Sequence, residues 1–290
     1  MPAYKRQHFV PASYLRYFAI DQSKCDRRSR LWRTDKNGSI QVSAKTQCAE
    51  NFIYSRDDAA VAEAHFQIFE KSYCDCLDCL RQDWDLSRQQ YGNLLLCMWN
   101  LNLRNAAHQN LSDHDGFRAY QIRWHLAATG LLLGGEGILF DTASFQAHIE
   151  NFWSLRIMVA PRDSFFITSD NPAMMISLSP VSRLVDGLVL PLTPTLLAFA
   201  FDHRRVRFKN TQLSPRDVSN LNGEQIINSI SAVYSAQPLS PDSLNAVRGH
   251  FSKAVPHTKT KFTNEHWIAP VREWPPDSDF SFLSAVPPVL

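Results

Sequence analysis

The chain has 290 residues, of which 44% are apolar and 11% aromatic, so it is long enough to bury the core of one large domain or two small ones. No segment approaches the ~18 uninterrupted apolar residues of a membrane span, and the first residues lack the apolar stretch of a signal peptide. We therefore expect a cytoplasmic protein with no membrane partner, whose six cysteines are free thiols.

Charge is unevenly distributed along the chain, although its net charge is only +2. Residues 1–47, which we call the basic arm, carry ten Lys and Arg against three Asp, and this net charge of +7 leaves −5 for the remainder. Lys and Arg release condensed counterions from nucleic acid, so a nucleic-acid partner is one interpretation of the arm. An ordinary solvated basic hairpin is the other.

The basic arm is predicted to form a short helix followed by a β-hairpin. Tyr14, Leu15 and Phe18 follow Pro11 at helical spacing. Residues 30–34 and 39–43 then alternate at period two around Asp35-Lys-Asn-Gly38, whose glycine suits a hairpin turn. The arm therefore predicts two paired strands at the N-terminal end of the fold.

The remainder of the chain changes from helices to strands and back to a helix. Helical periodicity dominates residues 58–152, with an almost entirely apolar helix at 94–103 and further helices after Ser112 and over 142–151. A helix is predicted from Ser214, where a hydroxyl, a proline and an acid form a capping pattern. Short apolar runs typical of an antiparallel meander occupy 154–160, 165–168, 173–176, 187–190, 195–201 and 205–209.

This order predicts an α+β fold, with the N-terminal β-hairpin arm, a central helical block and an antiparallel sheet packed on helices. We expect a single α+β domain over residues 1–237. Residues 238–290 are expected to form a C-terminal extension that is largely irregular, with at most one short helix near 243–251.

The stretch Thr168-Ser-Asp-Asn-Pro172 places a carboxylate at a corner between two apolar runs. Pro172 disfavours a helical conformation at Asn171, and Asp and Asn side chains readily bond the backbone of a turn. Asp170 is therefore expected either to face a pocket or to cap its own turn.

Three further residues carry candidate chemistry. His8-Phe-Val-Pro11 resembles the opening of His-Asn-His nucleases, in which the histidine activates water, although the other members of that motif are absent. Arg104 follows the apolar helix and suits phosphate binding. Glu70 lies on the first long helix, where it is expected either to meet Asp170 across a cleft or to pair with an Arg or His inside the fold.

Several ordered motifs together resemble DUF4238, a bacterial family of unknown function. They run from residue 5 to 237 and include Lys5-Arg-Gln-His-Phe-Val-Pro-Ala-Ser-Tyr-Leu-Arg-Tyr-Phe18, Ala49-Glu-Asn-Phe-Ile-Tyr-Ser55, Phe69-Glu70, Leu103-Arg-Asn105, Phe166-Ile-Thr-Ser-Asp-Asn-Pro172 and Val233-Tyr-Ser235. The resemblance implies no activity. It does imply a set of recurring polar residues, namely His8, Tyr14, Asn51, Glu70, Arg104, Asp170, Asn171 and Asn222.

From these residue types we hypothesise a metal-assisted phosphodiester hydrolase that acts on nucleic acid. Glu70 and Asp170 would hold Mg²⁺ or Mn²⁺, and His8 would act as acid or base. These three residues would form the catalytic site. Substrate would be bound by Arg6, Asn51, Arg104 and Asn171. The alternative hypothesis is a non-enzymatic binding or sensor module, itself able to bind nucleic acid, in which the recurring polar residues are structural.

Overall fold

The fold was analysed in a computed structural model that describes residues 6–21, 26, 28–51, 54, 59–82, 85–104, 151–177, 186–204, 206–208, 212–253, 272–273, 280 and 282–285. The helix predicted after Ser112 lies outside these residues, as does nearly all of the helix predicted over 142–151. The helices within the described residues are α1 (Ala12–Leu15), α2 (Ala59–Gln82), α3 (Arg88–Leu103), α6 (Pro215–Asn228) and α7 (Pro241–Lys253). None of the described helices is long and apolar enough to cross a membrane.

The strands form two small pairings and two larger sheets. Their bounds are β1 (Arg6–His8), β2 (Arg30–Asp35), β3 (Gly38–Ser43), β4 (Ala49–Asn51), β5 (Trp153–Val159), β6 (Thr168–Ser169), β7 (Met174–Ser177), β8 (Gly187–Pro191), β9 (Leu196–Asp202), β10 (Val206–Phe208), β11 (Val233–Ser235), β12 (Arg272–Glu273) and β13 (Leu283–Ala285). The sheet orders are β3-β2-β11-β6 and β12-β7-β8-β9-β5, while β1 pairs with β4 and β10 with β13. Helices and antiparallel strands in separate blocks confirm the α+β prediction.

The β2–β3 hairpin forms as its alternating pattern predicts. Asp35 faces Gly38 across a two-residue turn, and the Asp35 carboxylate accepts a hydrogen bond from the backbone N–H of Asn37 at 2.8 Å. Gly38 has φ +125°, a conformation that side chains with a Cβ rarely adopt. Two short 3₁₀ turns, η1 (Arg16–Phe18) and η3 (Ala44–Thr46), complete the described part of the arm.

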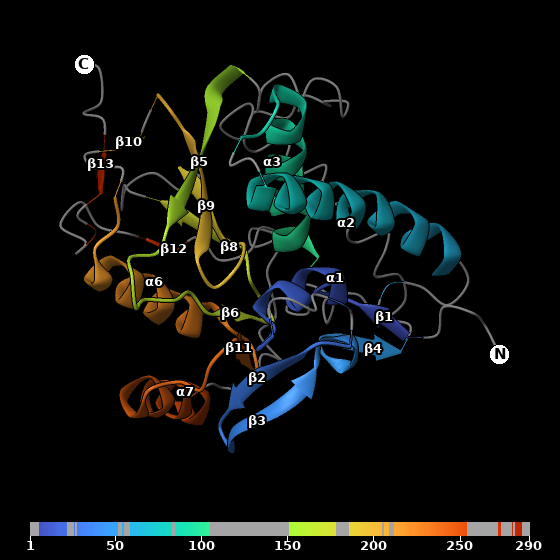
Figure 1. The fold of residues 1–290 in the computed structure, drawn as a ribbon, viewed down its shortest axis with the longest axis vertical. Coiled ribbons are helices and arrows are strands. Elements are labelled where there is room, and N and C mark those ends of the chain that lie inside the picture. The colour runs from blue at the N-terminus through green and yellow to red at the C-terminus, as the bar shows by residue number, and fades with distance from the viewer. Residues whose placement is uncertain are drawn as a thin grey trace, which may run out of the picture.

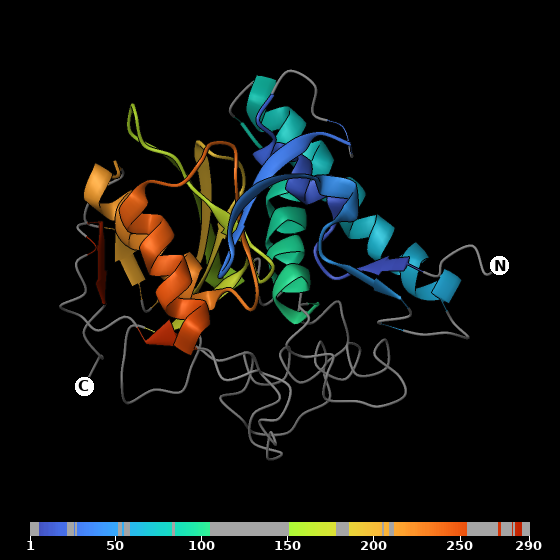
Figure 2. The ribbon, with the colours of Figure 1, turned by 90° about the horizontal axis from the view of Figure 1, so that it is seen from below.

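The larger apolar core surrounds α3. Because that helix is apolar on nearly every side, it lies between α2 and the five-stranded sheet (Figures 1 and 2). Trp99 of α3 meets Trp153 of β5 edge to face, with ring centroids 5.6 Å apart. The Ser87 hydroxyl and the Gln90 side chain cap the first turn of α3 reciprocally.

A second core covers the other face of the five-stranded sheet. Val218 and Leu221 of α6 pack there with Phe199 of β9. The Ser214 cap predicted for α6 is confirmed, since its hydroxyl accepts a hydrogen bond from the Asp217 N–H while the Asp217 side chain bonds the Ser214 N–H.

The described residues of the C-terminal extension, 238–253, 272–273, 280 and 282–285, include regular structure. They contribute the expected helix as α7, and β12 and β13 pair with β7 and β10. Phe282 is fully buried in the second core, where its ring centroid lies 6.2 Å from that of Phe199. The strands are only two and three residues long and lack a pattern of alternation that would predict them. The parallel pairing of β12 with β7 is the exception to the predicted antiparallel meander.

Candidate functional site

The Thr-Ser-Asp-Asn-Pro corner connects the two larger sheets. β6 ends at Ser169 in the four-stranded sheet, and after Pro172 the chain enters β7 of the five-stranded sheet. The run 173–176 is therefore a strand as predicted, whereas the run 165–168 is extended into a strand only at Thr168, and the two strands belong to different sheets. Asp170 lies in the connection between them and is 2% exposed.

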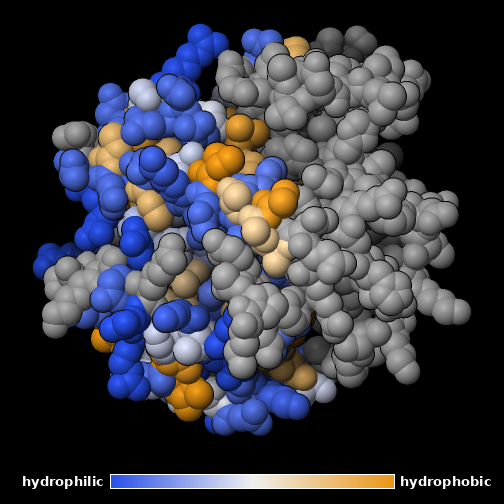
Figure 3. All heavy atoms as spheres, turned by 90° about the vertical axis from the view of Figure 1, so that its right-hand side faces the viewer, coloured by the Kyte–Doolittle hydropathy of each residue, from blue (hydrophilic) through white to orange (hydrophobic). Residues whose placement is uncertain are grey.

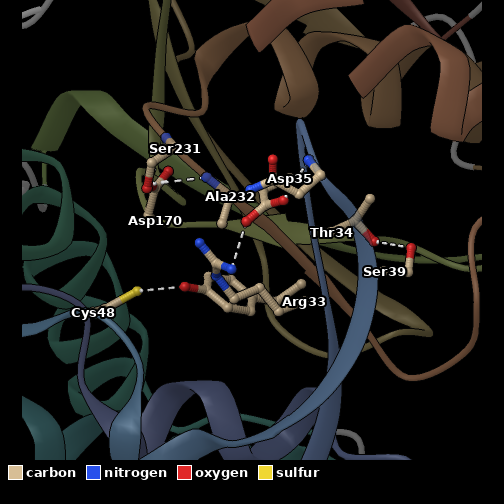
Figure 4. A network of polar contacts seen from close by, with 10 residues as sticks. Arg33, Thr34, Asp35, Ser39, Cys48, Asp170, Ser231 and Ala232 are labelled. Atoms are coloured by element: carbon tan, nitrogen blue, oxygen red, sulfur yellow. Dashed lines mark hydrogen bonds and ion pairs between the residues drawn. The ribbon is translucent and has the colours of Figure 1, made fainter. Parts of the chain in front are cut away.

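Asp170 holds the segment that joins α6 to β11 (Figure 4). Its Oδ1 accepts a hydrogen bond from the Ile230 N–H at 2.8 Å. Its Oδ2 accepts from the Ser231 N–H at 2.7 Å, the Ser231 hydroxyl at 2.6 Å and the Ala232 N–H at 3.2 Å. The backbone N–H of Asp170 in turn donates to the Ala232 carbonyl at 3.2 Å. The carboxylate therefore binds the backbone of this segment and does not cap its own turn.

The environment of Asp170 opposes its ionisation, because burial raises its pKa above the ordinary 3.8 while the four donors act in the opposite sense. Beside it, the Cys48 thiol donates to the Tyr234 hydroxyl at 3.3 Å, and burial raises the pKa of both groups. Arg33, in the same view, forms an ion pair with Asp35 at 2.6 Å (Figure 4). The side chains of Asp170, Cys48 and Arg33 thus each contact other groups of the protein.

Asn171 and Asn222 attach α6 to the strand that leads into the corner. The Asn171 side chain donates to the Asn228 carbonyl at 3.0 Å, and the Asn171 carbonyl accepts from the Asn228 side chain at 2.7 Å. Asn222 accepts from the Ile167 N–H at 3.0 Å and donates to the Phe165 carbonyl at 2.8 Å. Asn222 thus supplies partners for backbone groups that no neighbouring strand pairs, and Asn171 satisfies a carbonyl at the end of α6.

A second polar cluster has Arg104 at its centre. Its guanidinium is fully buried and donates to the Glu70 carboxylate at 3.1 Å, the Tyr54 hydroxyl at 3.1 Å and the His8 backbone carbonyl at 2.7 Å. It also lies over the Phe66 ring, 3.9 Å from the centroid. The arginine therefore ties the end of α3 to α2 and to β1, with its charge balanced by Glu70.

Glu70 has the only carboxylate in this cluster among the described residues. Its second oxygen accepts from the Ser13 hydroxyl at 3.0 Å, and its side chain keeps 17% exposure. The exposed part borders a recess of ≈10 Å³, about the size of one water molecule, which is also lined by Tyr14, Asn100 and Leu101. The ion pair therefore joins a fully buried guanidinium to a carboxylate that is partly exposed.

His8 contributes its backbone to this cluster, whereas its ring lies against η3. The ring Nε2 is 3.1 Å from the Lys45 carbonyl. Burial lowers the pKa of His8 below its ordinary 6.5, and the Lys45 contact and the charge of Glu70 only partly offset this effect. A neutral His8 that donates to Lys45 is therefore favoured near neutral pH.

Arg6 and Asn51 lie opposite each other at the outer end of the β1–β4 pairing, and both are exposed. Arg6 donates to the Thr46 carbonyl at 2.7 Å. Hydrophilic side chains dominate the described surface on the face toward which β1, β4 and the start of α2 point (Figure 3). These two residues are thus the predicted substrate ligands that remain accessible.

The predicted site residues consequently fall into three groups. His8, Glu70 and Arg104 form one cluster, Asp170 and Asn171 form another, and Arg6 and Asn51 lie at the surface. Tyr14 lies near both of the first two groups, since it lines the recess beside Glu70 and its hydroxyl bonds Thr168, two residues before Asp170, at 2.6 Å. The same hydroxyl donates to the Pro191 carbonyl at 2.7 Å. Among the described residues no three His, Cys, Asp or Glu side chains are placed to hold a metal ion. Metal binding by Glu70 and Asp170 stays a prediction.

Sequence reasoning overlooked Tyr54 and Ser231. The Tyr54 hydroxyl bonds both the guanidinium and the carbonyl of Arg104, and its own N–H donates to the Gln7 side chain at 2.8 Å. Its place in the Ala49–Ser55 motif was the available signal. Ser231 lies between Ile230 and Ala232 in a short connection with no periodicity, so nothing local indicated that it binds Asp170.

A model of a protein family, described as "Protein of unknown function (DUF4238)", matches residues 6–127 and 134–238. No curated protein and no solved structure matches the chain.

Proposed function

The chain belongs to the DUF4238 family, and from the contacts of its polar residues we propose that it is a non-enzymatic nucleic-acid-binding module. In this proposal the recurring polar residues hold the fold together, and exposed cations of the basic arm bind phosphate. The activity of the module would be recognition, with no bond broken in its partner.

The observation that carries this proposal is the complete burial of Arg104. Its 0% exposure and three protein acceptors leave no face of the guanidinium for a substrate phosphate. A buried charge of this kind is held by its partners, and removing one of them is strongly destabilising. The four hydrogen bonds to Asp170 support the same conclusion for the corner.

The distribution of exposed charge supports nucleic acid as the partner. Arg28, Arg30, Lys36 and Lys45 are all exposed on or beside the hairpin. Arg33, by contrast, is neutralised by its ion pair with Asp35. Exposed cations that form no ion pair with another described residue are those able to release counterions from a phosphate backbone.

Binding and its salt dependence test the proposal. Fluorescence anisotropy of a labelled oligonucleotide should show an affinity that falls linearly with salt on a log–log plot. Lys36→Gln/Lys45→Gln should weaken binding and reduce the slope by about 1 for each lost phosphate contact. Lys71→Gln on α2, an exposed cation outside the arm, is the control and should leave the slope unchanged. Wild-type protein that binds no oligonucleotide at low salt would refute the proposal.

The metal-assisted hydrolase is the rival candidate, and the partial exposure of the Glu70 carboxylate beside a water-sized recess is the observation in its favour. The same oligonucleotide, incubated with protein and Mg²⁺ or Mn²⁺, tests it on a denaturing gel. Cleavage that His8→Gln and Asp170→Asn both abolish, in variants that remain folded, would establish the hydrolase and reject the binding-only module.

A further inference from the structure

A surface pocket at the base of the hairpin combines charges of both signs. It has a volume of about 370 Å³ and is lined by Ile20, Asp21, Asp26, Arg28, Arg30 and Gln41, with Ser29 between the arginines. This volume lies at the lower end of the range for small-molecule sites. We call it the hairpin pocket; it contains none of the residues that the family resemblance singled out.

The described backbone at the hairpin pocket is held by hydrogen bonds. Asp26 and Ser29 form a closed turn, in which the Asp26 carboxylate accepts from the Arg28 N–H at 2.6 Å and the Asp26 N–H donates to the Ser29 hydroxyl at 3.0 Å. The Ile20 N–H donates to the Arg30 carbonyl at 2.8 Å, which joins two of the lining segments. Arg28 and Arg30 therefore project from a fixed turn and a fixed strand, as a preorganised site requires.

Arg28 and Arg30 differ from the other described arginines of the arm in what their guanidinium groups contact. Arg33 is paired with Asp35, and Arg6 donates to a carbonyl at 2.7 Å. The Arg28 guanidinium has no hydrogen bond or ion pair within the described part of the chain, and Arg30 reaches only the Gln41 carbonyl at 3.5 Å. Two guanidinium groups that line one pocket and have unused donors suit the oxygens of a phosphate, which arginine binds through two parallel N–H groups.

The remaining lining restricts the ligand further. The carboxylates of Asp21 and Asp26 disfavour a second phosphate and accept hydrogen bonds from N–H groups. Ile20 is 41% exposed and provides an apolar surface beside them. A nucleotide combines these features, because an anionic phosphate is joined to a flat base whose edge carries N–H donors.

We infer that the hairpin pocket receives one unpaired nucleotide of a single-stranded nucleic acid, with its phosphate on Arg28 and Arg30 and its base against Ile20. This inference rests on the proposed nucleic-acid binding and specifies the form that is bound. In a duplex the base edges are paired and stacked, so only an unpaired nucleotide offers both its phosphate and its base edge.

The test compares a fluorescein-labelled single strand with the matching duplex by anisotropy on the full chain. Wild-type protein should bind the single strand more tightly than the duplex. Arg28→Gln/Arg30→Gln should weaken single-strand binding on the order of tenfold. Lys71→Gln/Arg162→Gln removes the same charge from exposed positions outside the pocket and should change affinity by less than about twofold. Because all four side chains are exposed, circular dichroism should show both variants folded.

Competition separates a nucleotide site from a simple anion site. A nucleoside monophosphate should displace the labelled strand from wild-type protein at concentrations where inorganic phosphate and the unphosphorylated nucleoside do not. If single strand and duplex bind equally and the two double variants behave alike, the pocket assignment fails while the proposed nucleic-acid binding stands. If wild-type protein binds neither form, both fail.

Discussion

Replacing Asp170 by alanine removes the acceptor that holds the segment between α6 and β11. The N–H groups of Ile230 and Ala232 then lose their partner, whereas water reaches those of the exposed Ser231. Each donor left without a partner in the interior costs about 1 kcal/mol or more, and the loss of charge-assisted bonds adds to this. The alanine variant also no longer carries the cost of burying a carboxylate, so we expect a net loss of about 2–3 kcal/mol.

Urea unfolding followed by circular dichroism measures this loss, and the melting temperature should fall by roughly 4–10 °C. Asp75→Ala is the matched control, because Asp75 is exposed on α2 and its replacement should change stability by less than about 0.5 kcal/mol. Binding of an oligonucleotide by the folded variant should equal that of the wild type. A loss of stability below about 1 kcal/mol would show that the Asp170 contacts do not hold the corner.

Two further perturbations follow from burial. The pKa of His8 is lowered in the folded state, so the unfolded chain binds more protons below pH 6.5 and stability should fall as pH decreases through that range. His8→Gln, which can still donate to Lys45, should show a shallower fall in urea midpoints than the wild type, and equal slopes would contradict the argument. If the C-terminal extension belongs to the second core, Phe282→Ala should lower the free energy of unfolding by about 3–5 kcal/mol. The half-exposed Ile227→Ala is the control and should lower it by less than about 1 kcal/mol. Similar urea midpoints for the two variants would show that Phe282 does not contribute to this core.

Elements whose signals are local were predictable from the sequence. The hairpin follows from alternation around a glycine, and α6 follows from a capping pattern at Ser214 that needs only neighbouring residues. Apolar residues on every side of α3 indicated a central position, which the packing between α2 and the five-stranded sheet confirms.

Contacts between distant segments were not predictable in this way. Asp170 was recognised as a significant carboxylate, but its donors lie about 60 residues further along the chain in a connection with no pattern. Arg104 was expected to face phosphate, whereas its buried acceptors come from three separate segments that only the tertiary fold brings together. The pairing of β13 with β10 was likewise not predictable, because Phe282 packs on Phe199 about 80 residues earlier in the chain. No local pattern in the extension indicates this contact.

The place of β11 between β2 and β6 has a consequence for the order of folding. Trp32 of the arm is in register with Ser235, about 200 residues later in the chain, so this sheet cannot close until synthesis has passed Ser235. The arginine-rich hairpin is therefore synthesised before β11, and until β11 is available one edge of β2 is unpaired. During synthesis it is a cationic surface without its final neighbour, and it gains that neighbour only when β11 pairs with β2.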